Sequence, residues 1–317
     1  MDTANKYIQQ IKDIFEQEKD RYAAHKTIQP IMAKLTQDKQ FLHDIIKKSL
    51  SDPEFIAKVR HYPTLSMYIY KDKNIDMNAH IFMPLPDQNT DITFQSIHHH
   101  GNLLLTTAAA FGPGYESILF KKGFTLDMDT QIATMQVEKI YQFRQGEVEF
   151  VDAFQPHVVF FPKDVSITYV VWSNQKPEHA TAQSLKQNPL IRKFKKPIKK
   201  VLHRLGLSQK MGINVVEYYD FYPENGKIKA LKHRIEFEHG DNQNFLTNFF
   251  HVMQKVGFQD TDFLSHLAQK YPQNSTLQTL VQGFVSGEPI PAPFYESHRT
   301  VRYVNLHREE IMKAIHS

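Results

Sequence analysis

Hydrophobic residues recur at helical spacing through the first 60 or so positions of the chain. The first apolar stripe is formed by Ile8, Ile11, Ile14 and Phe15. Two more stripes follow, at Ile31 to Leu35 and at Leu42 to Leu50. Because residues three and four apart lie on one face of a helix, this pattern predicts amphipathic helices. Asp52 followed by Pro53 marks a further helix start, since Asp caps free amides and Pro fits the first turn.

From about Pro63 the pattern changes to short apolar runs, such as TLSMYIY, NAHIFMPLP, LLLTTAAAF and SITYVVWS. Turn signals separate these runs, among them Gly112-Pro113-Gly114 and Gln145-Gly146. Many short strands with turns between them are typical of antiparallel barrels and sandwiches. We therefore expect a β core from residue 63 to residue 175.

The remainder of the chain holds a hairpin and a second helical region. Asn225-Gly226 favours a two-residue hairpin turn, and helical periodicity returns from Asn242, with a last helix from about Leu306. The predicted segments are an N-terminal helical segment (1–62), the β-barrel (63–175), a basic segment with the hairpin (176–241) and a C-terminal helical segment (242–317). The expected fold class is α+β, with helices flanking an antiparallel barrel.

The composition is that of a folded protein with a sizeable core. The 317 residues are 41% hydrophobic and 23% charged, which excludes the disordered and low-complexity classes. The chain has no cysteine, so disulfides, iron–sulfur clusters and a thiol nucleophile are excluded, and any metal must be held by His, Asp or Glu. The N-terminal residues lack the apolar run of a secretory signal, and no stretch is long enough to span a membrane. We expect a cytoplasmic protein.

The formal net charge is +4, from 38 basic and 34 acidic residues, and is too small to indicate a nucleic-acid partner. Positive charge is nevertheless concentrated, because residues 186–210 contain nine basic and no acidic residues. Apolar residues recur at helical spacing within this segment, at Ile198, Val201, Leu202 and Leu205. The segment is either a solvated linker or a docking patch for an acidic partner, such as a phosphate-bearing ligand or a membrane surface.

Among the 17 histidines, the run His98-His99-His100 is distinctive because it closes a predicted strand. Alternate side chains of a strand share a face, so His98 and His100 point together while His99 points away. Two imidazoles on one face make half of a metal site. The alternative is a polar strand end exposed to solvent.

The surrounding residues favour the metal site over the exposed strand end. The stretch ITFQSIHHHGNLLLTTAAAFGPGYESILF is followed by a strand that begins at Pro156-His157. This pattern resembles the cupin superfamily, in which one strand carries His-x-His and a distant strand returns a third His. Within that superfamily it looks most like the cysteine dioxygenase type of thiol dioxygenase. The resemblance extends from Ser66 to Ser173 and implies a double-stranded β-helix.

The resemblance implies that His98, His100 and His157 are ligands of Fe(II). Imidazole also suits Zn, Ni and other divalent metals, so iron rests on the resemblance alone. Many cupins add a Glu four or five residues after the second His, where this chain has Leu104 and Leu105. A three-His site leaves coordination positions open, as a catalytic site requires.

Other features of the thiol dioxygenases are absent from the sequence. Their Ser-His-Tyr relay corresponds here to Thr168, Val170 and Trp172. Where the family uses an Arg for the substrate carboxylate, the chain offers Lys71, which can pair only as a point charge. Cysteine itself is therefore a poor candidate substrate.

Several further residues are assigned to the predicted site. We expect Tyr169, Trp172 and Phe94 near the metal, either as an aromatic wall for a substrate or as barrel filling. Glu116 is expected either as a strand residue or as a hydrogen-bond partner of a ligand. His80 can also point inward, but we do not assign it as a ligand.

Three functional hypotheses follow. The first is a cupin-fold, iron-dependent oxygenase that oxidises a small organic substrate with O2. The second keeps the metal without redox chemistry, as in an isomerase, a hydrolase or a small-anion binder. The third is a scaffold whose helical flanks and basic segment bind a partner. The chain has no phosphate-binding loop and no dinucleotide-binding fingerprint, and the sequence does not determine the substrate or the oligomeric state.

Overall fold

The structure is a computed structural model of the whole chain. It describes residues 3–58, 60–61, 64–127, 129–173, 219–232, 238–239, 242–292 and 306–316. The basic segment at 186–210 and its expected helix at Ile198 to Leu205 lie outside the described residues. Among the described helices, none is long and apolar enough to cross a membrane.

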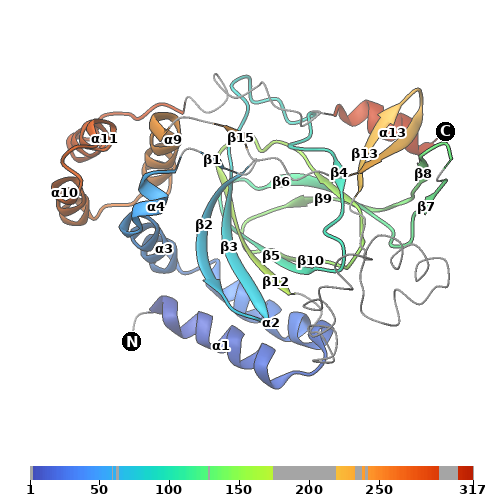
Figure 1. The fold of residues 1–317 in the computed structure, drawn as a ribbon, viewed down its shortest axis with the longest axis horizontal. Helices are drawn as coiled ribbons and strands as arrows, with labels where there is room; N and C mark the ends of the chain where they lie inside the picture. Colours follow the sequence, from blue (N-terminus) through green and yellow to red (C-terminus); the bar gives the residue numbers. More distant parts are fainter. Residues whose placement is uncertain are drawn as a thin grey trace, which may run out of the picture.

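Eight strands form the centre of the molecule (Figure 1). They are β3 (Ile75–Phe82), β4 (Ile97–His98), β5 (Leu104–Phe111), β6 (Tyr115–Phe120), β9 (Val137–Phe143), β10 (Val148–Val151), β11 (His157–Val159) and β12 (Ser166–Ser173). One sheet contains the order β10-β5-β12-β3, and the other contains β4-β11-β6-β9. Counted along the chain, the first strand pairs with the eighth and the second with the seventh, all antiparallel. This is jelly-roll order, the double-stranded β-helix of the cupin type.

Further strands extend both sheets. β2 (Leu65–Lys71) adds to the edge of the first sheet, which then has five strands. The second sheet reaches eight strands through β7 (Thr125–Leu126), β8 (Ile132–Thr134), β13 (Tyr219–Glu224) and β14 (Lys227–Lys232). A separate two-stranded sheet joins β1 (Arg60–His61) to β15 (Glu238–His239).

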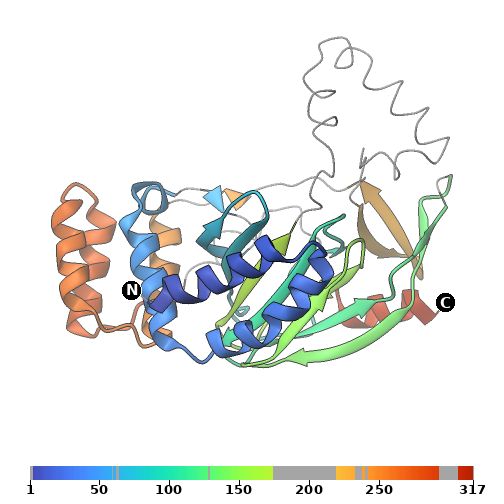
Figure 2. The same cartoon turned by 90° about the horizontal axis from the view of Figure 1, so that it is seen from below.

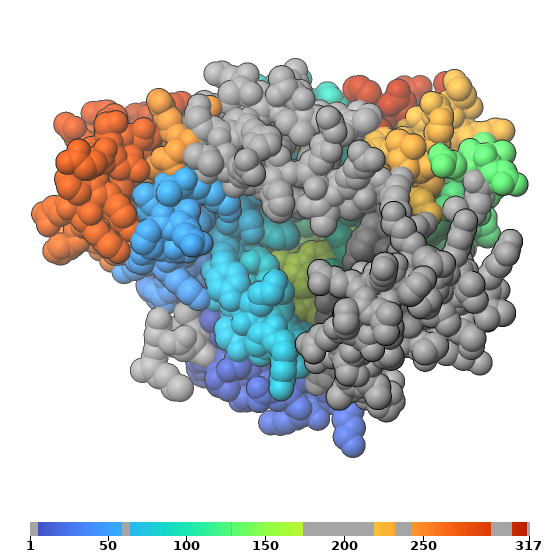
Figure 3. Space-filling model, in the orientation of Figure 1, coloured from blue at the N-terminus to red at the C-terminus, as the bar shows by residue number. Residues whose placement is uncertain are grey.

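The described helices flank the barrel, so the predicted α+β fold is confirmed. The N-terminal helices are α1 (Thr3–Gln17), α2 (Arg21–Leu35), α3 (Lys39–Ser51) and α4 (Pro53–Ile56). The C-terminal helices are α9 (Asn242–Lys255), α10 (Thr261–Lys270), α11 (Ser275–Ser286) and α13 (Arg308–His316). Figure 2 shows α1 and α2 lying along the five-stranded sheet. Helices α10 and α11 occupy one end of the molecule, and α13 with the β13–β14 hairpin occupies the other (Figure 3).

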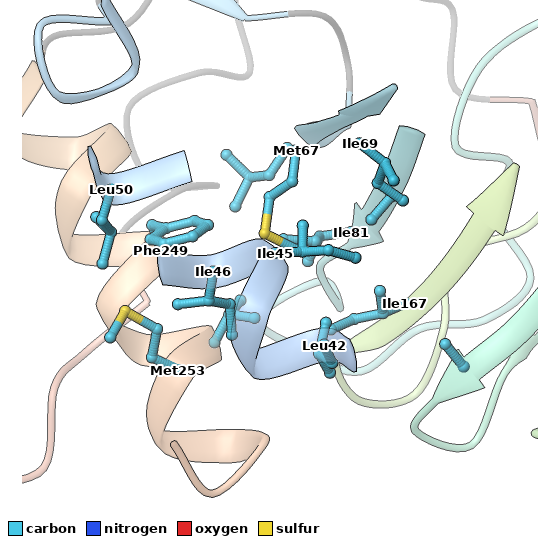
Figure 4. Close-up of a cluster of buried hydrophobic side chains, with 14 of the residues drawn as sticks. Leu42, Ile45, Ile46, Leu50, Met67, Ile69, Ile81, Ile167, Phe249 and Met253 are labelled. Atoms are coloured by element: carbon cyan, nitrogen blue, oxygen red, sulfur yellow. The ribbon is translucent and has the colours of Figure 1, made fainter. Parts of the chain in front are cut away.

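The main core lies between the five-stranded sheet and the helices (Figure 4). On β3 the odd-numbered residues Met77, Ala79 and Ile81 are buried in this core, while the intervening residues are half-exposed. Helix α3 packs its buried side chains, such as Ile46, between the sheet and Phe249 of α9. Strand alternation therefore gives this sheet an outer face for the helices and an inner face for the barrel interior.

Glycines make the tight turn between β5 and β6. Gly112 and Gly114 have positive φ values of 85° and 75°, which residues with a Cβ rarely adopt. A Cβ on Gly114 would lie 1.6 Å from the carbonyl oxygen of Phe143, and one on Gly112 would lie 2.0 Å from that of Val165. The turn therefore requires glycine at both positions, and it returns the chain from one sheet to the other.

The predicted Asn225-Gly226 hairpin is present, but it does not stand apart from the barrel. Both residues have positive φ values, 51° and 74°, as a two-residue hairpin turn of this kind requires. Strand β13 pairs with β4, and Asp220 lies opposite His98. The hairpin therefore extends the sheet that carries the first predicted metal ligand.

Candidate metal centre

Three histidines converge inside the barrel. His98 on β4 and His157 on β11 are directly opposite each other in an antiparallel pair, and His100 follows two residues after His98. The ring centroids lie 4.4 Å apart for His98 and His157, 4.6 Å for His100 and His157, and 4.9 Å for His98 and His100. His99 points the other way, toward Phe221. The alternation expected of a strand thus brings the two outer histidines of the run together.

Backbone carbonyls orient two of the three rings. The Nδ1 atom of His98 lies 3.0 Å from the carbonyl oxygen of Ser96. The Nδ1 atom of His157 lies 3.3 Å from the carbonyl oxygen of Gln155. A carbonyl only accepts, so each of these Nδ1 atoms carries the proton, and the lone pair that could bind a metal is on Nε2. His98 Nε2 lies 3.1 Å from His100 Nε2. One nitrogen from each of the three rings lies within 4.8 Å of the others.

Burial keeps two of these rings, those of His100 and His157, neutral. Desolvation lowers the pKa of His157 to about 4 and the pKa of His100 well below its usual 6.5. Neutral imidazole is the form that binds metals. His100 Nδ1 is buried and has no hydrogen-bond partner among the described residues. Three convergent lone pairs without any carboxylate fit a divalent transition metal with open positions, and the group leaves Fe, Zn and Ni undistinguished.

Trp172 of β12 forms the wall beside this centre. Its ring meets that of His100 edge-on, at 4.4 Å between centroids and 84° between planes. Trp172 is opposite Asp76 in the β12–β3 pair, and Asp76 binds the ammonium group of Lys71 on β2. Lys71 is thus engaged with Asp76 near the centre, and its predicted role toward a substrate carboxylate stays a prediction.

The expected place of Tyr169 beside the metal is wrong. Tyr169 belongs to the helix-facing core, where its ring contacts that of Phe41 at 5.2 Å. Its burial there also raises its pKa above the usual value for a phenol. The physical reason is strand parity, because Tyr169 and Trp172 are three positions apart and point to opposite faces of β12.

Glu116 and Phe94 also lie away from the three histidines. The carboxylate of Glu116 binds the guanidinium of Arg308 on α13, outside the barrel. It is therefore a strand residue that anchors α13, not a partner of a ligand. Phe94 packs inside the barrel between Phe82 and Phe161, at centroid distances of 5.2 and 5.1 Å. It fills the barrel, which is one of its two expected roles.

Sequence reasoning missed one residue at the centre. The amide nitrogen of Gln95 lies 2.6 Å from His98 Nε2, the atom that faces the cluster. Its position three residues before His98 was the available signal. Because Gln95 lies in a bend and not in a strand, no periodic pattern indicates where its side chain points.

No protein-family model and no curated protein matches the chain. Solved structures resemble parts of it. An RmlC-like cupin protein from Desulfovibrio desulfuricans is 14% identical, with 35% of this chain and 81% of that one covered at a TM-score of 0.23. The protein TT1209 from Thermus thermophilus is 14% identical, with 39% of this chain and 96% of that chain covered at a TM-score of 0.25. The DMSP lyase DddQ from Ruegeria pomeroyi is 10% identical, with 37% of this chain and 49% of that chain covered at a TM-score of 0.25. Similarity this weak assigns neither a substrate nor a reaction to this chain.

Proposed function

We propose that this protein is a cupin-type, non-haem iron-dependent oxygenase that acts on a small organic substrate with O2. The observation that carries the proposal is the convergence of His98, His100 and His157, because one nitrogen from each ring lies within 4.8 Å of the others. Fe(II) bound there would supply electrons to O2 and hold the two reactants together. The choice of iron rests on the sequence resemblance to the cysteine dioxygenase type.

The residues around the centre orient the ligand rings and cover part of the site. The carbonyls of Ser96 and Gln155 hold two ligand rings in the correct tautomer. Trp172 covers one side of His100 and restricts access to the centre. Such fixed groups hold the ligands and reactants in place without reorganisation.

A substrate other than cysteine suits these surroundings. Thr168 and Trp172 stand where the thiol dioxygenases have relay residues, and both side chains lack the acid–base chemistry of that relay. The ammonium of Lys71 binds Asp76, so a substrate carboxylate would have to compete for it. We therefore propose an oxygenase whose substrate is not an amino acid held by its carboxylate.

A second candidate function is a metal-dependent reaction without redox chemistry, such as isomerisation or hydrolysis. The observation that favours it is His80, which lies at an inward position on β3, opposite Thr168. Burial lowers the pKa of His80 to about 4, so at neutral pH its imidazole is uncharged and can exchange hydrogen bonds with a substrate. Substrate turnover without oxygen uptake would identify this second function.

Metal binding is tested first, on protein purified without an affinity histidine tag. The single tryptophan of the chain, Trp172, touches His100, so its fluorescence reports on the centre. We expect near-stoichiometric iron in the purified protein and, once this iron has been removed, quenching of the fluorescence by added Fe(II). Both should be lost in His98→Ala and His157→Ala and retained in His266→Ala, which removes an exposed histidine of α10.

Oxygen uptake with candidate substrates then tests the reaction. Stoichiometric iron with substrate-dependent oxygen consumption supports the oxygenase. Equal metal binding in wild type and in both ligand variants would contradict the three-His centre, whatever the activity.

A further inference from the structure

The inner face of the five-stranded sheet is unusually polar next to the candidate metal centre. On β12, Thr168 lies opposite His80 of β3, and Val170 lies opposite Thr107 of β5. Residues directly opposite on one face of a sheet are close neighbours. Thr168 and Thr107 are 1% and 7% exposed, so their hydroxyls are withdrawn from bulk solvent.

A third hydroxyl comes from the other sheet. Tyr115 on β6 is buried, and its hydroxyl is near enough to Thr168 and Thr107 for both to lower its pKa, although burial raises that pKa overall. Apart from this approach of the Tyr115 hydroxyl, neither threonine Oγ1 has a hydrogen-bond partner among the described residues. Buried hydroxyls in native proteins nearly always have partners. Three hydroxyls and one imidazole therefore lie together, and their unused hydrogen-bonding capacity could be satisfied by a polar group of a bound molecule.

Aromatic rings close the barrel beyond this place. Tyr115 packs against Phe82 and Phe143, at centroid distances of 4.7 and 5.5 Å. Phe94 and Phe161 belong to the same cluster. A group bound at the hydroxyls would thus have apolar rings on one side and the three histidines on the other.

The charged side chains around this place offer no cationic partner for an anionic group. The charged side chains at inward positions of β9 and β10, Lys139 and Glu149, form an ion pair with each other. Lys71 is paired with Asp76 at the Trp172 end of β3. No free cation of the described barrel strands therefore faces the hydroxyls, and a buried carboxylate without a cation is strongly unfavourable.

We propose that Thr107, Thr168, Tyr115 and His80 form a subsite for an uncharged hydroxyl or carbonyl group of the substrate. This rests on the proposed function, since the same molecule presents its reacting atom to the three-His centre. The substrate class is accordingly a neutral, oxygen-bearing compound such as an alcohol or polyol. The subsite binds it by hydrogen bonds to neutral groups, and the polar group is recognised away from the metal.

The test compares propane-1,2-diol with lactate, which has the same carbon skeleton but a carboxylate. Both are titrated into the full-length Zn(II)-loaded protein and followed by Trp172 fluorescence. We expect saturable diol binding that weakens about tenfold in Thr168→Val and in Tyr115→Phe, because a buried partner is left unpaired. Thr168→Ser should restore it, since the hydroxyl returns.

Two controls separate the subsite from its surroundings. Thr106→Val removes a hydroxyl from the opposite face of β5, where it bonds His25, and should leave diol affinity unchanged. Lactate affinity should not respond to Thr168→Val. Absence of saturable diol binding, or diol affinity unchanged in both Thr168→Val and Tyr115→Phe, would overturn the proposal.

The experiments distinguish a failure of the subsite from a failure of the proposed function. Iron binding without oxygen uptake, together with the expected diol results, would remove the oxygenase and keep the subsite. Oxygen uptake together with diol affinity that is unchanged in the variants would keep the oxygenase and remove the subsite.

Discussion

His25 is a fully buried histidine on α2 that joins this helix to the five-stranded sheet. Its Nδ1 and Nε2 lie 2.7 Å from the hydroxyls of Thr106 and Ser173. Burial, with a smaller contribution from Arg21, lowers its pKa to about 3. The ring is therefore neutral in the folded protein and bridges two strands that carry the barrel wall.

This pKa predicts acid sensitivity between pH 6.5 and about 3. Because the folded-state pKa is below the unfolded value, protons bind preferentially to the unfolded chain as pH falls through 6.5. His25 should then lower the free energy of unfolding by about 1.4 kcal/mol per pH unit. Urea unfolding of the metal-free protein at several pH values measures this slope.

The variant His25→Gln isolates this contribution. It should be less stable than the wild type at pH 7, yet lose less stability over the same pH range, because one buried histidine is gone. Part of the loss should persist, because the pKa values of His80 and His157 are also lowered. An unchanged slope in His25→Gln would show that His25 does not carry the effect.

At the scale of single residues, motif spacing predicted more than residue type did. His98 and His100 could be paired from strand alternation, but the contribution of His157 depended on the family resemblance, since 57 positions separate it from His100. The error over Tyr169 was avoidable, because the parity that turns Trp172 inward also turns Tyr169 outward. Gln95 could not be placed, since a bend has no periodicity.

At the scale of the elements, α2 contacts the loop between His100 and β5. Arg21 Nη1 donates to the carbonyl oxygens of Asn102 and Ser173, at 2.6 and 3.3 Å. Asn102 lies two residues after His100, and Ser173 follows Trp172. A single guanidinium thus ties together the chain segments that carry a predicted ligand and its aromatic neighbour.

We expect Arg21→Met to weaken metal binding about tenfold, because loss of an outer contact lets the ligand loop move. Titration of the protein with Ni(II), followed by Trp172 fluorescence, measures this. Arg308→Met is the matched control, since Arg308 is also partly buried but binds Glu116 and Asp91 on the outer side of the other sheet. Equal loss of affinity in the two variants would show that Arg21 acts only through overall stability.

The elements themselves were predictable where the signal is local. The Asp52-Pro53 helix start is present, with the Asp52 carboxylate accepting from the amide of Glu54 at 2.9 Å. The Asn225-Gly226 turn also formed as expected. The strand with which this hairpin pairs could not be predicted from the sequence. Strands β13 and β4 lie more than 100 positions apart in the chain, and their pairing is set by packing, not by turn chemistry.

On the scale of the whole molecule, one continuous core joins the barrel to both helical flanks. Residues of β3, β12, α3 and α9 belong to the same buried cluster, and Figure 4 shows α3 between the strands and α9. The sequence predicted a barrel with helices at both ends. It did not show that residues 1–62 and 242–292 share a core, since that contact depends on which helix face meets which sheet face.

A shared core predicts that barrel and helices unfold together. Phe249 on α9 is 1% exposed and contacts Phe55 at a centroid distance of 4.9 Å. Phe249→Ala should therefore lower the free energy of unfolding by about 3–5 kcal/mol. Val285→Ala on α11, where the side chain is 48% exposed, should change it by less than about 0.5 kcal/mol.

Urea unfolding followed by two signals tests whether this loss reaches the barrel. Trp172 fluorescence reports on the barrel, and far-ultraviolet circular dichroism is dominated by the helices. Cooperative unfolding requires the two transitions to coincide and to shift together in Phe249→Ala. If the fluorescence midpoint stayed in place while the helical signal moved, α9 to α11 would be an independent unit. The barrel would then hold the three histidines without support from the C-terminal helices.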